Sequence, residues 1–178
     1  TSITQEQIQA EAPNNIVDFI NTLPAMANTR SPTQGNNAIS SGATGMSLLD
    51  LRGLGADRTL VLVDGRRHVG STLQGSVDAN ALPTGLIRGV DIVTGGASSV
   101  YGSDAIAGVV NFMLDKYYTG TKGFLQAGRS GYHDDEQTSA GISFGQAFAD
   151  GRRHVLLSSV HATSDGVAAA PDSSWSRG

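Results

Sequence analysis

Short apolar runs separated by glycine, proline and hydroxyl residues make up the first two-thirds of the chain. Between Asn14, a suitable N-cap, and Pro24, which ends a helix, apolar side chains recur on one broad helical face. The run at 60–63 is continuously apolar, which predicts a central strand covered on both faces. Residues 90–94 and 107–114 predict two more strands, each preceded by a short helical turn. This order predicts an α+β fold, a small mixed sheet with short helices.

Two polar features interrupt these runs. Asp64-Gly65 stands between an apolar run and a second extended piece, and it is the strongest hairpin signal in the chain. Residues 31–45 consist almost entirely of Ser, Thr, Asn, Gln, Gly, Pro and Ala. Such a segment buries little, so it is either a solvated loop or a loop that contacts a ligand.

The pattern changes after Lys116. Over residues 139–148, larger and mostly apolar side chains alternate with serine, glycine and alanine. A period of two over about ten residues is typical of a tilted membrane-spanning β-strand, although a soluble hairpin shows the same periodicity. Residues 122–131 and 154–166 predict neighbouring antiparallel strands of the same meander.

Composition excludes several classes of protein. The chain has 12 basic and 16 acidic residues, a formal net charge of −4 and no Lys/Arg run, which argues against a nucleic-acid partner. It has no cysteine, which excludes disulfides and thiolate chemistry. No apolar run approaches the roughly 20 residues that a membrane-spanning helix needs. The first residues lack the charged start and apolar core of a signal peptide, so we expect a mature piece of a protein.

No motif assembles an enzyme site. The segment GGASSVYG, residues 95–102, fits neither the GxSxG nucleophile motif nor a phosphate-binding P-loop, and we interpret Ser98 and Ser99 as helix caps. The GxG of LRGLGADR precedes a strand, whereas a dinucleotide-binding GxG follows one. The four histidines lack metal-ligand spacing, and the acidic residues 134–136 are most simply a solvated turn. We predict no catalytic residue, no metal site and no cofactor.

Three long blocks carry a resemblance to a known family. They are NTLPAM at 21–26, LRGLGADRTLVLVDGRRH at 51–68 and VDANALPTGLIRGVDIVTGGASSVYGSDAIAGVVNF at 77–112. In this order they resemble the plug domain of TonB-dependent outer-membrane receptors. The resemblance implies a plug at 1–118 that occludes a barrel of about 22 strands. Residues 119–178 are then the first two to three antiparallel strands of that barrel, truncated here.

The resemblance also implies a function and partners. A plug gates the uptake of an extracellular small ligand such as an iron chelate, an oligosaccharide or a peptide. TonB acts on it from the periplasm, the remainder of the barrel surrounds it, and the protein lies in the outer membrane of a Gram-negative bacterium. No TonB box is recognisable before Ile3 and most of the barrel is missing, so we expect a cut piece or a truncated gene product. The alternative is a free-standing periplasmic binding or signalling module with the plug fold.

A plug–barrel lock is one site that the resemblance implies. Arg52 resembles the plug arginine that pairs with acidic residues of the barrel wall, and Asp91 matches an acidic strand position of the family. Gly89 stands where the family usually has a second arginine. Arg88 lies beside it and is expected on the other face of the strand.

Ligand-binding loops are the other site that the resemblance implies. The segments 31–45 and 66–78 are the expected apical loops, and the glycines and alanines of 95–108 would let the plug pack closely against a barrel wall. The arginine pair in 66–78 favours an anionic ligand, whereas GGAS in place of the proline-containing form of siderophore receptors points away from one. Ordinary solvation explains the same loop residues. The polar candidates for ligand contact are Asn36, Asn37, Arg67, His68 and Gln74.

Overall fold

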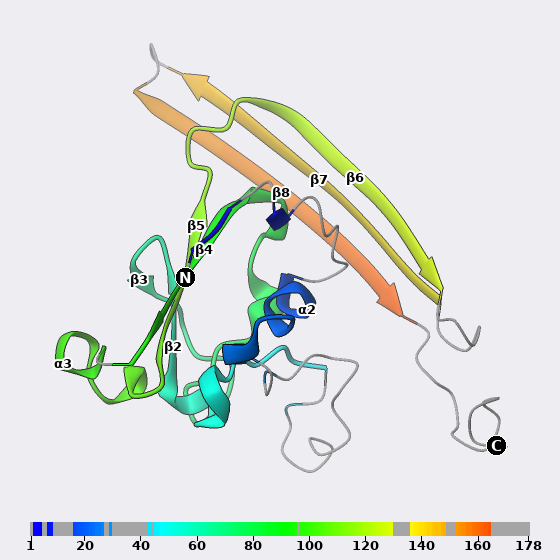
Figure 1. Cartoon of the computed structure of the whole chain (residues 1–178). Coiled ribbons are helices and arrows are strands. Elements are labelled where there is room, and N and C mark those ends of the chain that lie inside the picture. Colours follow the sequence, from blue (N-terminus) through cyan, green and yellow to red (C-terminus); the bar gives the residue numbers. More distant parts are fainter. Residues whose placement is uncertain are drawn as a thin grey trace, which may run out of the picture. The chain divides into compact units, whose positions relative to one another are not determined.

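The chain forms two compact units, Thr1–Asp115 and Lys116–Gly178 (Figure 1). The computed structural model describes residues 2–4, 7–8, 16–26, 29, 43, 45–95, 97–129, 136–148 and 152–164. None of the helices within these ranges is both long enough and apolar enough to cross a membrane.

A five-stranded mixed sheet is the frame of the first unit. In spatial order its strands are β1 (Ser2–Thr4), β4 (Ile87–Thr94), β5 (Gly108–Leu114), β2 (Thr59–Val63) and β3 (Arg66–Arg67). β2 pairs parallel with β5, whereas β1 with β4, β4 with β5 and β2 with β3 pair antiparallel. The predicted α+β fold with a small mixed sheet is therefore confirmed.

Short helices surround this sheet, and the predicted amphipathic helix is one of them. The described helices are α2 (Ile16–Asn21), η1 (Pro24–Met26), η3 (Leu51–Gly53), η4 (Ala56–Arg58), η5 (Ala79–Ala81), η6 (Thr84–Leu86), α3 (Ser98–Tyr101) and η7 (Ser103–Ala105). Pro24 ends α2 as predicted and begins η1, because proline is tolerated at the first position of a helix. Asn14, its predicted cap, lies outside the described residues.

The sheet is buried on both faces, which explains the uninterrupted apolar run of β2. Val61 packs in the main cluster with Phe112 of β5, α2 and Met26. The residues beside it in β2, Leu60 and Leu62, belong to a second cluster with Val109, Ala97 and Ala105. Alternate side chains of a strand point to opposite faces, so a strand in this position must be apolar throughout.

Two glycines hold backbone positions that other residues would strain. Asp64 and Gly65 both have positive φ, 51° and 76°, as a tight two-residue hairpin turn requires, which confirms the predicted hairpin between β2 and β3. Gly108 has φ 143°, and a Cβ there would overlap the carbonyl oxygen of Val93 and lie 3.0 Å from Leu51 Cδ1. The close approach of Gly108 is thus made within the sheet itself. Packing of the small residues of 95–108 against a barrel wall stays a prediction.

The predicted serine cap of α3 is wrong. The N-cap residue of α3 is Ala97, which makes no side-chain capping bond, and Ser98 is the first helical residue. The helix is only four residues long and Ala97 is buried against the sheet. Packing of this small side chain, rather than capping, fixes where the helix begins.

The second unit is a three-stranded antiparallel sheet in the order β6 (Gly120–Arg129), β7 (Glu136–Phe148) and β8 (Arg153–Ser164). Figure 1 shows the three strands side by side. The predicted alternation divides its faces. On one face β7 places the small residues Ser139, Ser143 and Gly145, which are buried. The same face also carries Phe124 of β6 and Leu156 and Val160 of β8. The exposed large side chains of the other face are Leu125, Ile142, Phe144, Phe148, Val155 and Leu157.

Candidate functional site

Residues 68–78 form a compact protrusion, which we call the 68–78 loop. The amides of Ser71 and Thr72 both donate to the carbonyl of Ser76, at 2.8 and 3.2 Å. The amide of Ser76 donates back to Thr72 Oγ1 at 3.0 Å. These bonds close the loop upon itself, and at its tip Leu73 is fully exposed and Gln74 is exposed. A loop closed in this way is preorganised for contact with another molecule.

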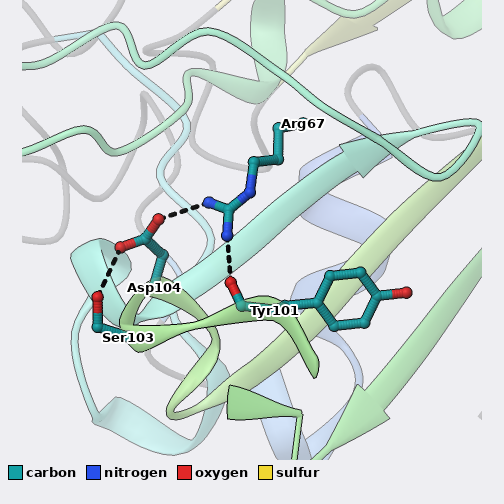
Figure 2. A network of polar contacts seen from close by, with 4 residues as sticks. All are labelled: Arg67, Tyr101, Ser103 and Asp104. Atoms are coloured by element: carbon teal, nitrogen blue, oxygen red, sulfur yellow. Dashed lines mark hydrogen bonds and ion pairs between the residues drawn. The ribbon is translucent and has the colours of Figure 1, made fainter. Parts of the chain in front are cut away.

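An arginine network holds the start of the 68–78 loop (Figure 2). Arg67 Nη1 lies 2.5 Å from Asp104 Oδ2, and Arg67 Nη2 donates to the carbonyl of Tyr101. Ser103 Oγ donates to the second carboxylate oxygen of Asp104 at 3.2 Å. β3 is thereby fastened to the segment that carries α3 and η7. The side chains of the ion pair are 49% and 55% exposed, so solvent screens their attraction.

A second polar network holds the end of the same loop. Asp78 Oδ1 accepts from the amides of Ser47 and Asn80, at 2.9 and 3.0 Å. Ser47 Oγ donates to Asn80 Oδ1 at 2.8 Å, and Asn80 Nδ2 donates to the carbonyl of Gly45 at 3.0 Å. Gly45 is the last residue of the segment 31–45. The network therefore brings the ends of both predicted apical loops together.

Sequence reasoning missed this second network. Asp78 and Asn80 lie within the third block, but Ser47 lies outside all three and 31 positions before Asp78, so no motif pairs them. The one local signal is Asp78 itself, because aspartate is a preferred N-cap and here caps η5 by accepting from Asn80.

The predicted ligand-contact residues have different surroundings. Asn36 and Asn37 lie outside the described residues. Gln74 stands exposed at the loop tip, and half-buried His68 places Nδ1 3.0 Å from the carbonyl oxygen of Val69. The guanidinium of Arg67 is already bonded to Asp104 and Tyr101.

The two predicted lock arginines lie near opposite ends of β4: Arg52 in η3 and Arg88 in β4 itself. Arg52, exposed and with a positive φ of 58°, donates from Nη2 to the carbonyl of Ala107 at 3.2 Å. Ala107 precedes the residue that pairs with the last residue of β4. Exposed Arg88 lies at the other end of β4, at an irregularity between Ile87 and Gly89. The structure therefore does not bring the two arginines together.

The other two lock positions lie within the sheet. Asp91 is half-buried in β4, where it pairs with Ser2 of β1 and Asn111 of β5. Gly89 is buried, and a Cβ there would lie 2.8 Å from the carbonyl oxygen of Ile3. Because β1 covers this position, it has no room for the arginine that the family usually has here.

The polar side chains around the 68–78 loop and η3 serve mainly to hold the backbone in place. Arg52, Arg67 and Asn80 each donate to a carbonyl, and Asp78 accepts from amides. Within the described ranges, no three His, Asp or Glu side chains gather as metal ligands would. These hydrogen bonds fix the 68–78 loop, and the side chains named here do not join a nucleophile to a base.

Comparison with known proteins identifies a family and several structures that are similar to this chain. Residues 1–109 match the TonB-dependent Receptor Plug Domain family. The siderophore receptor PirA from Pseudomonas aeruginosa is similar in fold, with 22% identity and a TM-score of 0.67 over 94% of this chain and 29% of that one. PirA from Acinetobacter baumannii gives 23% identity and a TM-score of 0.66 over 91% of this chain and 24% of that one.

A variant of the ferric enterobactin receptor PfeA from Pseudomonas aeruginosa, in complex with enterobactin, is also similar. It has 24% identity and a TM-score of 0.66, and the match covers 93% of this chain and 24% of that one. The chain thus spans only 24–29% of the length of these receptors. At this identity the likeness shows the fold, in which a mixed plug sheet is followed by antiparallel barrel strands. The family match covers more than half of the chain, which therefore belongs to the TonB-dependent receptor plug domain family.

Proposed function

We propose that this chain is the gate, with the first barrel strands, of an outer-membrane transporter driven by TonB. One observation carries the proposal: a plug-family sheet at 1–109 is followed by a three-stranded antiparallel sheet whose central strand, β7, alternates larger, mostly apolar residues with serine, glycine and alanine. The compact units divide after Asp115, which supports a boundary between plug and barrel close to the expected residue 118. Neither unit performs covalent chemistry in this proposal.

The faces of the second sheet support a place in the barrel wall. Strands of outer-membrane barrels alternate apolar side chains toward lipid with polar ones toward the lumen. Most exposed apolar side chains of β7 and β8 lie on one face: Ile142, Phe144, Phe148, Val155 and Leu157. Ser143 Oγ and Ser158 Oγ lie 2.9 Å apart on the other face, which also carries the exposed Val160. The protein then resides in the outer membrane of a Gram-negative bacterium, with the remainder of the barrel and TonB as its partners.

The 68–78 loop is the proposed ligand-contact surface, together with the segment 31–45. Gln74 and His68 are the polar candidates that the structure describes, and Asn36 and Asn37 complete the set. Arg67 is held by Asp104, so it contributes to a ligand site chiefly by fixing the loop. The similar structures are siderophore receptors, which makes an iron chelate the first ligand to test, before an oligosaccharide or a peptide.

The proposed lock involves Arg52, Arg88 and Asp91. Arg52 and Arg88 are both exposed, so each can reach an acidic residue of a surrounding wall. Because they lie at opposite ends of β4, they would meet the wall at two separate heights. Replacing Arg52 with alanine should raise the leak conductance of the barrel, and an unchanged leak would remove its role in the lock.

Localisation and uptake together test the proposal. The gene is deleted and restored in its native host at natural length, and the cell fractions are assayed for the protein. We expect it in the outer membrane, with uptake of radiolabelled ferric chelate that stops when TonB is removed. Gln74→Ala should reduce uptake several-fold, whereas Asp57→Asn, an exposed change on η4 outside both loops, should not. A protein found free in the periplasm would favour the alternative binding or signalling module instead.

A further inference from the structure

The start of the second unit does not run free before its first strand. At Tyr118 the chain passes directly over β7, so close that a Cβ on Gly145 would overlap the carbonyl oxygen of Tyr118. From β8, His154 Nε2 lies 3.1 Å from that same oxygen. A carbonyl only accepts, so Nε2 carries the proton and donates, which the ring can do in its Nε2–H neutral form and when protonated.

The two tyrosine side chains add contacts of their own. Lys122 Nζ lies 4.5 Å from the centroid of the Tyr118 ring, a cation–π distance. The ring of Tyr117 meets His154 edge-on, with centroids 6.0 Å apart and an interplanar angle of 87°. Gly120, at a positive φ of 114°, turns the chain from this segment into β6.

All these contacts fall on one face of the second sheet. Gly145 pairs with Leu156 of β8, and His154 stands two residues earlier in that strand, so both project to the same side. Their sequence neighbours Phe144 and Val155 belong to the opposite, exposed apolar face. The segment therefore lies on the face that carries Ser143 and Gly145, where a glycine at position 145 leaves room for the backbone.

We propose that residues 116–119 form a clasp that fastens the connection between the two units to strands β7 and β8. Gly145 provides the space, His154 the hydrogen bond, and Lys122 the contact with the Tyr118 ring. The sequence carries DGRRH twice, and the second histidine, His154, serves here as a fixing group. The consequence for transport rests on the proposed function. When the plug moves, only residues before Asp115 are displaced, because the clasp keeps residues 116–119 attached to β7 and β8.

Proteolysis measures the clasp directly. Chymotrypsin cleaves the Tyr118–Thr119 bond only when the segment leaves the sheet, so the rate reports the open population. Loss of one hydrogen bond in His154→Ala should raise cleavage about threefold to tenfold. Gly145→Ala, which displaces the carbonyl itself, should raise it by more than about tenfold. The protein is studied at natural length in detergent micelles, and mass spectrometry identifies the cleaved bond.

Gly141→Ala is the matched control. It lies on the same strand and face, but its Cβ would meet the ring of Phe124, an exposed side chain that can rotate away. Its cleavage rate should change less than about twofold. Amide exchange of residues 139–143, measured in every variant, separates loss of the clasp from loss of the sheet. Equal cleavage in Gly145→Ala, His154→Ala and Gly141→Ala would overturn the clasp.

Outer-membrane permeability to a large antibiotic tests whether the clasp keeps the plug in the barrel. If the clasp holds the plug, Gly145→Ala and His154→Ala should sensitise cells that carry the natural-length protein, and Gly141→Ala should not. Faster cleavage without sensitisation would retain the clasp and overturn its effect on gating. Failure of the transporter proposal is recognised separately, because then no uptake of ferric chelate depends on the gene while cleavage still responds to the variants.

Discussion

Asp78 offers the sharpest test of how the candidate site is built. Its Oδ1 accepts from two backbone amides, those of Ser47 and Asn80, on segments that are distant in sequence. Asp78→Ala removes this acceptor, whereas Asp78→Asn keeps an acceptor oxygen of the same shape. The two variants therefore separate the hydrogen bonds from the side-chain volume.

The expected magnitude follows from the burial of the two donors. Ser47 is fully buried, and losing an acceptor for a buried amide costs about 1–3 kcal/mol. Asn80 is exposed and water can replace its partner, so losing this capping bond costs about 0.5–1 kcal/mol. Asp78→Ala should thus lower the free energy of unfolding of the first unit by about 1.5–4 kcal/mol. Asp78→Asn exchanges a charged acceptor for a neutral one and should cost about 1 kcal/mol or less.

Amide hydrogen exchange of β2 and β5 reports this free energy, because amides in the centre of a sheet exchange through global opening. A urea titration gives an independent value, in which 2 kcal/mol moves the midpoint by about 1 M for a unit of this size. The amides near Gly45 and in the 68–78 loop should exchange faster in the alanine variant. If Asp78→Ala and Asp78→Asn differ by less than about 0.5 kcal/mol, the network does not join the two loops, and our account of the site is wrong.

Three further changes test the frame around the site. Gly108→Ala should cost more than about 3 kcal/mol in thermal unfolding, since its Cβ would overlap the carbonyl of Val93 at a positive φ; near-wild-type stability would contradict the register of β4 and β5. Phe112→Ala, fully buried in the main cluster, should cost about 3–5 kcal/mol by denaturant titration, and a loss under 1 kcal/mol would refute that packing. A double-mutant cycle on Arg67 and Asp104 should give a coupling of about 1 kcal/mol or less, because both side chains are half exposed; a coupling above 3 kcal/mol would mean a desolvated pair.

Local sequence patterns predicted much of the fold. The apolar run of β2, the Asp64-Gly65 turn and the period of two in β7 each depend on residues a few positions apart, and each prediction is confirmed. Such features can be predicted from the sequence because strand alternation and turn geometry act over short stretches of chain. The serine cap of α3 failed for the opposite reason, since buried Ala97, packed against the sheet, decides where that helix begins.

The sequence predicted only part of the candidate site. Sequence reasoning selected Arg67 and His68 as ligand contacts, but the structure gives Arg67 a partner, Asp104, that lies 37 positions away. Nothing local marks such a pair, because the two segments meet only when β3 and η7 are folded onto the sheet. The same holds for Ser47 with Asp78, which the patterns did not reveal.

The sequence by itself determined the elements and the family, because propensity, periodicity and long ordered motif blocks are properties of neighbouring residues. Only the tertiary structure decided the strand order β1-β4-β5-β2-β3, the covering of Gly89 by β1 and the seating of Tyr118 on Gly145. Each of these depends on which distant segments come within contact distance. That choice is made by burial of the whole apolar surface and by pairing of every backbone group, which no short stretch of sequence encodes.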